Sequence, residues 1–321
     1  MIRINGRIII GAFIASALIG AAVLLTTENA DGQSRDETDL RALRKQALSL
    51  VNQARTTRDR SELHLSEPLN AAAQSHAEDM LQRNYYSHTS PEGDDVRDRF
   101  MDQGGSRWKL VAENIATCRG CSVPSDAGRV REFHEGWMQS PGHRRNILQE
   151  GLSGFGFGIA GADGTIYAVQ TFAGAGTSAG GEEQVREKSL SRDEQSDFAL
   201  SVLNEKRREA GLSPLQPSDH LAQAALNLQE NGSSLNDGRD IYAALPEGRG
   251  DWRSINLLQA TCGGCGTEPM RSDIRRFLDQ WLDGRASQSP LLAESATHFA
   301  LHLHANGEGR KSAIALVGSH F

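Results

Sequence analysis

The chain contains the same series of motifs twice, and this repetition is the feature that most constrains its fold. The stretches "AENIATCRGC", "REFHEGWMQSPGHRRNIL" and "GFGFGIAGADGTIYAVQTFAG" recur as "INLLQATCGGC", "RRFLDQWLDGRASQSPLL" and "HFALHLHANGEGRKSAIALVG". Paired residues of these blocks, such as Trp137 and Trp281, are 144 positions apart. Upstream, "LVNQAR" recurs as "VLNEKR" at a spacing of 152. A repeat of this size is a whole domain, so we predict two domains with one fold.

The first residues predict export. The basic start "MIRINGR" precedes an almost uninterrupted apolar run from Ile8 to Leu25, which is typical of an export signal. The run is near the minimum length for a bilayer span, and no convincing small-x-small cleavage site follows it. Residues 1–27 are therefore interpreted as a signal anchor or as a cleaved signal peptide. Either sends the remaining chain outward, to the cell surface, the periplasm or the medium.

Composition and charge divide the rest of the chain. We predict a first domain over residues 38–174, a flexible linker over 175–190 that is rich in Gly, Ser and Glu, and a second domain over 191–321. The formal net charge is −7, with acids and bases interspersed. No basic patch is evident, so a nucleic-acid partner is not expected.

Hydrophobic periodicity predicts the secondary structure of the first copy. Apolar residues recur at helical spacing from Leu40 to Ala54, from Leu69 to Met80 and from Val130 to Met138. Ser140 is positioned to cap a further short helix over His143–Leu148. The pattern then changes to period two on either side of "GADG", which is a hairpin signal. Helices followed by a terminal hairpin indicate an α+β fold with helices packed on an antiparallel sheet.

Four ordered motifs of the first copy give it a family resemblance. The stretches "HAEDMLQRNYYSHTSPEG", "AENIA", "WMQSPGHRRNIL" and "FGFGIA…YAVQTFAG" resemble the CAP superfamily, also called the SCP or cysteine-rich secretory, antigen 5 and pathogenesis-related 1 family, and in particular its bacterial branch. The resemblance covers about Leu40 to Gly174. It implies a three-layer α-β-α sandwich, present here in tandem behind the N-terminal signal-anchor helix. The second copy resembles the family only through the first.

The resemblance also implies a cavity. Eukaryotic relatives hold a divalent metal between two His and two Glu, and three of these positions fall here on His88, Glu113 and His143. Ser140 stands where the family has its second Glu, which leaves a four-ligand metal site in doubt. Two imidazoles and one carboxylate suit zinc with an open position, with His88 and His143 as ligands. The same residues also suit a hydrogen-bonded cavity wall without metal.

The second copy lacks this set. Ser287 matches His143, and Ile255 or Leu257 matches Glu113, depending on where the alignment gap falls. No histidine replaces His88. Apolar replacement of a carboxylate favours a closed core, because an unpaired buried charge is costly. We interpret the second copy as a degenerate structural partner.

All four cysteines form two CxxC units in equivalent places of the copies, Cys118 with Cys121 and Cys262 with Cys265. An exported protein meets oxidising conditions, which favours one short disulfide in each copy. A four-thiolate zinc site joining the copies is the alternative. A thioredoxin-like redox role has less support, since no βαβ context surrounds either pair.

The residues favour a binding function. We expect the cavity of the first copy to hold a small molecule, a lipid or a cell-envelope partner outside the cytoplasm. One alternative is a metal-assisted hydrolase of peptide or envelope material, with Glu113 as general base. Neither "HExxH" nor "GxSxG" is present to support it. A siteless adhesion or scaffold module is the other alternative.

Overall fold

The structure is a computed structural model that describes residues 39–178, 188–230, 241–246, 251–283 and 289–320. The apolar run Ile8–Leu25, predicted as an anchor or signal, lies outside these residues, as does most of the predicted linker. Among the helices that are described, none is both long and apolar enough to cross a membrane.

The first half of the chain folds around one four-stranded sheet. Its elements are, in order, a helix over residues 39–56, β1 (His64–Leu65), α2 (Glu67–Arg83), α3 (Val96–Asp102), β2 (Leu110–Arg119), α4 (Ala127–Gln139), α5 (Pro141–Leu148), β3 (Gly154–Ala162) and β4 (Thr165–Gly174). The strand order is β1-β3-β4-β2. Strand β4 is antiparallel to both β3 and β2, and β1 pairs in parallel with β3. The α+β class is therefore confirmed.

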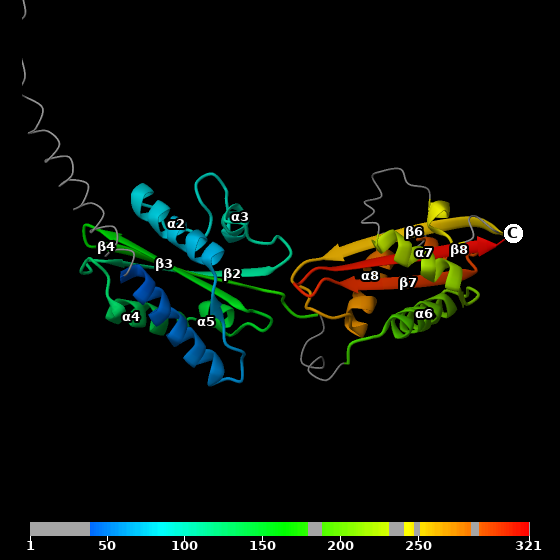
Figure 1. The fold of residues 1–321 in the computed structure, drawn as a ribbon, viewed down its shortest axis with the longest axis horizontal. Coiled ribbons are helices and arrows are strands. Elements are labelled where there is room, and N and C mark those ends of the chain that lie inside the picture. The colour runs from blue at the N-terminus through cyan, green and yellow to red at the C-terminus, as the bar shows by residue number, and fades with distance from the viewer. Residues whose placement is uncertain (1–38, 179–187, 231–240, 247–250, 284–288, 321) are drawn as a thin grey trace, which may run out of the picture.

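Helices cover both faces of this sheet, because its central strand alternates its apolar side chains. Ile166, Ala168 and Phe172 of β4 pack with the helix over residues 39–56 and with α4. Tyr167 and Val169 of the same strand pack on the other face, against α2. The result is three layers, with α2 and α3 on one side and α4, α5 and the first helix on the other (Figure 1).

The predicted hairpin is present. Asp163 and Gly164 join β3 to β4, and both have positive φ, 49° and 75°, as a two-residue primed turn requires. Glycines of β3 also allow α2 to approach the sheet closely. A Cβ added at Gly156 would lie 2.2 Å from the carbonyl carbon of Leu69 in α2, so no side chain fits there.

The second half forms a sheet with the corresponding strand order, β5-β7-β8-β6. Its elements are α6 (Arg192–Glu209), β5 (Gln216–Pro217), α7 (Asp219–Glu230), the 3-10 turn Ile241–Ala244, β6 (Trp252–Cys262), α8 (Arg271–Asp283), the 3-10 turn Pro290–Leu292, β7 (His298–Ala305) and β8 (Lys311–His320). Helices α6 and α8 pack in one apolar cluster, and α7 packs in another across the sheet.

A buried arginine occupies the same structural place in each half. Arg55 and Arg207, 152 positions apart, are both fully buried and donate to backbone carbonyls. The acceptors of Arg55 are Ser61, Ile147 and Gln149, and those of Arg207 are Ser213, Leu291 and Ala293. Each guanidinium thereby ties the first helix of its half to the segment that precedes the terminal hairpin.

The beginning of the predicted linker is held in place. Gly176 forms an antiparallel bridge with Cys265, and the amide of Gly266 donates to the carbonyl of Ala175 at 2.9 Å. The hydroxyl of Ser178 donates to the carbonyl of Cys265 at 3.2 Å. Residues 175–178 therefore form part of a junction between the halves, where composition alone predicted a flexible segment.

Candidate functional site

A buried carboxylate lies at the centre of the candidate site. Strand pairing fixes Glu113 of β2 opposite Thr171 of β4, and the Glu113 side chain is only 2% exposed. Its Oε1 accepts a hydrogen bond from His88 Nδ1 at 2.8 Å, and its Oε2 accepts one from Arg99 Nη2 at 2.8 Å. A buried charge requires such partners, because desolvation without them is costly.

His88 presents this pair to solvent. It lies between α2 and α3, and its side chain is 55% exposed. Arg99 also donates to the His88 carbonyl at 3.0 Å, which fixes the loop against α3. Since Nδ1 donates to the carboxylate, the neutral ring has a free acceptor at Nε2. No partner for Nε2 is found in the part of the chain that the structure describes.

His76 lies next to the same carboxylate. It is buried on α2, and its Nε2 is 2.9 Å from the Ser87 carbonyl. The same nitrogen is 4.0 Å from Glu113 Oε1. Burial lowers the pKa of His76, while the charge of Glu113 acts in the opposite direction. His76 therefore forms the inner wall of the site.

Asn114 connects β2 to α5, which bears the second predicted histidine. Its amide donates to the His143 carbonyl at 3.2 Å, and its oxygen accepts from Asn146 at 3.0 Å. Asn146 also donates to the Glu113 carbonyl at 3.0 Å. Asn114, which is fully buried, is therefore a structural tie between β2 and α5.

Among the described residues, neither His143 nor Ser140 forms a side-chain hydrogen bond with Glu113 or His88. Burial, followed by repulsion from His88, lowers the pKa of His143, so the two rings feel each other's charge. Ser140 ends α4 and occupies the N-cap position of α5. The side chain of Ser140 accepts no capping bond, and α5 begins at Pro141, two residues earlier than predicted.

The arrangement does not fit a divalent metal, which was one of the two possibilities that the sequence left open. Over the described residues, no three His, Cys, Asp or Glu side chains are placed to hold an ion. Both oxygens of Glu113 are already bonded, one of them to a cation. The Arg99 guanidinium supplies the positive charge that a metal would otherwise bring, and it would repel one.

Residues 48–172 match the CAP family, the Cysteine-rich secretory protein family. This part of the chain is a CAP domain. The sequence is 30% identical to the protein YkwD of Bacillus subtilis (strain 168) over 145 residues, 45% of this chain and 52% of YkwD. It is 31% identical to the membrane protein YlbC of the same organism over 115 residues, 36% of this chain and 31% of YlbC. The chain thus spans about half of YkwD and a third of YlbC.

Among solved structures, an extracellular protein containing an SCP domain from Bacillus anthracis str. Ames is similar to part of this chain. It is 28% identical, with a TM-score of 0.34, over 41% of this chain and 40% of that chain.

Outside the site, the CAP domain has the predicted pairing of its cysteines. Cys118 is bonded to Cys121, and Cys262 to Cys265 in the second half. Every cysteine is paired, so the chain retains no thiol for the alternative zinc site.

Arg99 is the residue of the CAP domain that the sequence interpretation missed. It lies in "DDVRDRF", where a run of charges is typical of a solvated face. The sequence carried only an indirect signal for a cation beside Glu113. A carboxylate on a buried strand needs a positively charged partner, and neither His88 nor His143 has to be charged. No sequence distance marks Arg99 as that cation, since α3 reaches the site only through the fold.

Proposed function

We propose that the protein is an exported, membrane-anchored tandem CAP protein that binds a cell-envelope ligand through His88, Glu113 and Arg99 of its first domain. The observation that carries the proposal is an exposed imidazole fixed by a buried carboxylate. Such a pair is rigid, accessible and polar, as a recognition site requires.

One exposed and unfilled hydrogen-bonding atom favours a ligand with hydroxyl or amide donors. His88 Nε2 is an acceptor without a partner among the described residues, on a side chain that is 55% exposed. An exposed acceptor fixed by a carboxylate matches a glycan or peptide better than an apolar molecule. Peptidoglycan carries all of these groups and is a suitable first probe.

The residues of the second half that correspond to Glu113 and His76 support a binding site in the first domain alone. Counted along the strands from the two disulfides, Leu257 of β6 corresponds to Glu113. Leu228 of α7 corresponds to His76 by the upstream spacing of 152. Leu228 and Leu257 pack in the same apolar cluster. The equivalents of His88 and His143 lie outside the described residues. This pattern supports a degenerate second CAP copy that stabilises the first.

Export and anchoring rest on other observations. The N-terminal run Ile8–Leu25 has the composition of a signal anchor, and the relative YlbC is a membrane protein. Two disulfides are consistent with an oxidising compartment.

The binding proposal is tested with isolated peptidoglycan sacculi and the chain from residue 28 onward. The wild type is expected to sediment with sacculi, and His88→Ala and Glu113→Gln to lose at least tenfold in affinity, about 1.4 kcal/mol. His64→Ala is the matched control, because His64 is an exposed histidine on β1 of the same domain. Equal retention of His88→Ala and wild type would contradict the proposal and favour the scaffold alternative.

A hydrolase remains the second candidate, because a carboxylate that orients an imidazole is also a general-base arrangement. Release of soluble amino sugars or amines from the same sacculi, lost in His88→Ala, would favour it.

A further inference from the structure

The disulfide of the second half lies at the junction between the halves. In its CxxC loop, the backbone amide of Gly264 donates a hydrogen bond to the carbonyl of Trp108 at 2.7 Å. Gly264 has φ of +66°, and an added Cβ would lie 3.2–3.4 Å from Leu110 of the CAP domain. The conformation of this loop, which the disulfide closes, therefore sets how the halves meet.

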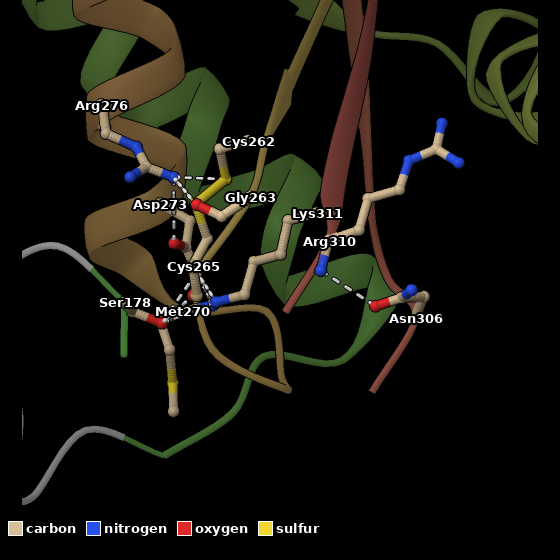
Figure 2. Close-up of a disulfide and its surroundings, with 10 residues drawn as sticks. All are labelled: Ser178, Cys262, Gly263, Cys265, Met270, Asp273, Arg276, Asn306, Arg310 and Lys311. Atoms are coloured by element: carbon tan, nitrogen blue, oxygen red, sulfur yellow. Dashed lines mark hydrogen bonds and ion pairs between the residues drawn. A yellow bond between two sulfur atoms is a disulfide. The ribbon is translucent and has the colours of Figure 1, made fainter. Parts of the chain in front are cut away.

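Two cations gather around this disulfide (Figure 2). Arg276 of α8 places Nη2 2.6 Å from Cys262 Sγ and 3.2 Å from Cys265 Sγ. Lys311 and Asp273 are both fully buried and form an ion pair at 2.5 Å, and Arg276 lies 3.8 Å from the same carboxylate. The carboxylate of Asp273 is thus in contact with two cationic side chains, those of Lys311 and Arg276. An excess of positive charge beside sulfur favours thiolate.

The disulfide of the CAP domain has a different setting. Position 132, equivalent to Arg276, holds Glu132, which pairs with Arg129 at the surface. Cys118 faces the apolar Ile166 across its ladder, whereas Cys262 faces Lys311. Among the described residues, no Arg or Lys side chain forms a hydrogen bond with the sulfurs of Cys118 and Cys121. The chain therefore contains its own comparison, a disulfide of the same CxxC spacing with a glutamate in place of Arg276 and no hydrogen bond from a cation to its sulfurs.

We propose that Cys262–Cys265 is a thiol–disulfide exchange site for a protein dithiol, and that its reduction loosens the junction between the halves. Cys262 is half-buried and Cys265 is buried, so the dithiol attacks Cys262 Sγ. A bond forms between the incoming sulfur and Cys262, the Cys262–Cys265 bond breaks, and Cys265 leaves as a thiolate beside Arg276. The second thiol of the partner then attacks the partner's first sulfur in the mixed disulfide, which forms the partner's disulfide and releases Cys262 as a thiolate. Two electrons pass to the protein, the dithiol becomes a disulfide, and its two protons go to the cysteines or to solvent.

Reduction removes the closure of the loop that carries the contacts with the CAP domain. Ser178 links the same cluster to the end of the CAP domain, since Lys311 Nζ lies 2.6 Å from its hydroxyl. A new thiolate near Arg276 competes with Asp273 for the guanidinium, which alters the charge balance of this cluster. The hydrogen bonds from Gly264 and Gly266 are expected to open more often as a result.

The test titrates the two disulfides of one chain against reduced and oxidised dithiothreitol, with differential alkylation and mass spectrometry of each cysteine peptide. Cys262–Cys265 is expected to be half-reduced at a ratio of reduced to oxidised dithiol at least tenfold lower than Cys118–Cys121, about 30 mV for two electrons. Arg276→Glu, matched to Glu132, should remove this difference. Glu132→Arg, on an exposed surface, should make Cys118–Cys121 easier to reduce. Equal ratios in the wild type, or no response to either substitution, would overturn the exchange site.

Hydrogen exchange measures the effect on the junction. At a dithiol ratio that reduces only Cys262–Cys265, the peptide covering residues 262–267 should exchange at least several-fold faster, while peptides of β3 and β4 should not change. Unchanged exchange in the loop peptide would overturn the proposed loosening. A negative result in these two experiments would not count against the proposed peptidoglycan binding, because His88 and Glu113 do not contact the cluster around Cys262–Cys265.

Discussion

At the scale of single residues, burial decides which polar groups shape this protein. Glu113 is held by His88 and Arg99, and Lys311 by Asp273, so each of these buried charges has a partner of opposite sign. His302 of β7 differs from these. Its Nδ1 is buried without a partner in the described structure.

His302 makes stability depend on pH. Burial first, then the charges of Arg192 and His304, lower the pKa of His302 to about 4. The unfolded chain binds this proton near pH 6.5, whereas the native state binds it only near pH 4. The free energy of unfolding therefore falls as the pH drops from about 6.5 to about 4, with a slope below the limit of about 1.4 kcal/mol per pH unit, since the side chain is partly exposed.

Urea unfolding at pH 7, 5.5 and 4 checks this dependence. His302→Leu should flatten the slope, and His304→Leu, at an exposed position on the same strand, should retain most of it, because burial is the largest cause of the pKa shift of His302 and His304 the smallest. Identical slopes in wild type and His302→Leu would show that the His302 proton is not linked to folding.

At the scale of elements, sequence periodicity predicted the hairpin strands, whereas the shortest strands and helix α3 depend on tertiary contacts. The alternation of β4 and the "GADG" turn follow from period two and from turn chemistry, and both are present. Strands β1 and β5 have only two residues each, too few for any period to show. Helix α3 is short and charged, so its role in placing Arg99 depends on tertiary contacts that no local pattern records.

The contact between β3 and α2 gives a prediction with a matched control. Gly156→Ala places a Cβ against the backbone of Leu69 and should destabilise the protein by about 1–3 kcal/mol. Gly136→Ala lies in α4, where an added Cβ meets nothing within 4 Å, and should stabilise by about 0.5–1 kcal/mol. Thermal unfolding should move in opposite directions for the two variants. A Gly156→Ala protein as stable as wild type would contradict the close packing.

At the scale of the whole molecule, the two halves share an architecture and differ in polarity. The first surrounds Glu113 with polar groups, and the second places its charges around Cys262–Cys265 at the junction. The repeat made the common sheet order predictable from sequence. The junction was not predictable, because its contacts join backbone groups of Trp108, Gly264 and Gly176 that carry no sequence signal.

The most direct measurement is where a ligand binds. We would label the histidine rings with ¹³C and ¹⁵N in the chain from residue 28 onward and add soluble peptidoglycan fragments. We predict that the ring signals of His88 shift most and that those of neighbouring His143 shift as well. Signals of His64 in the CAP domain and of His220 and His304 in the second half should stay in place. Shifts confined to His220 or His304, with His88 unchanged, would contradict the assignment of the site to the first domain.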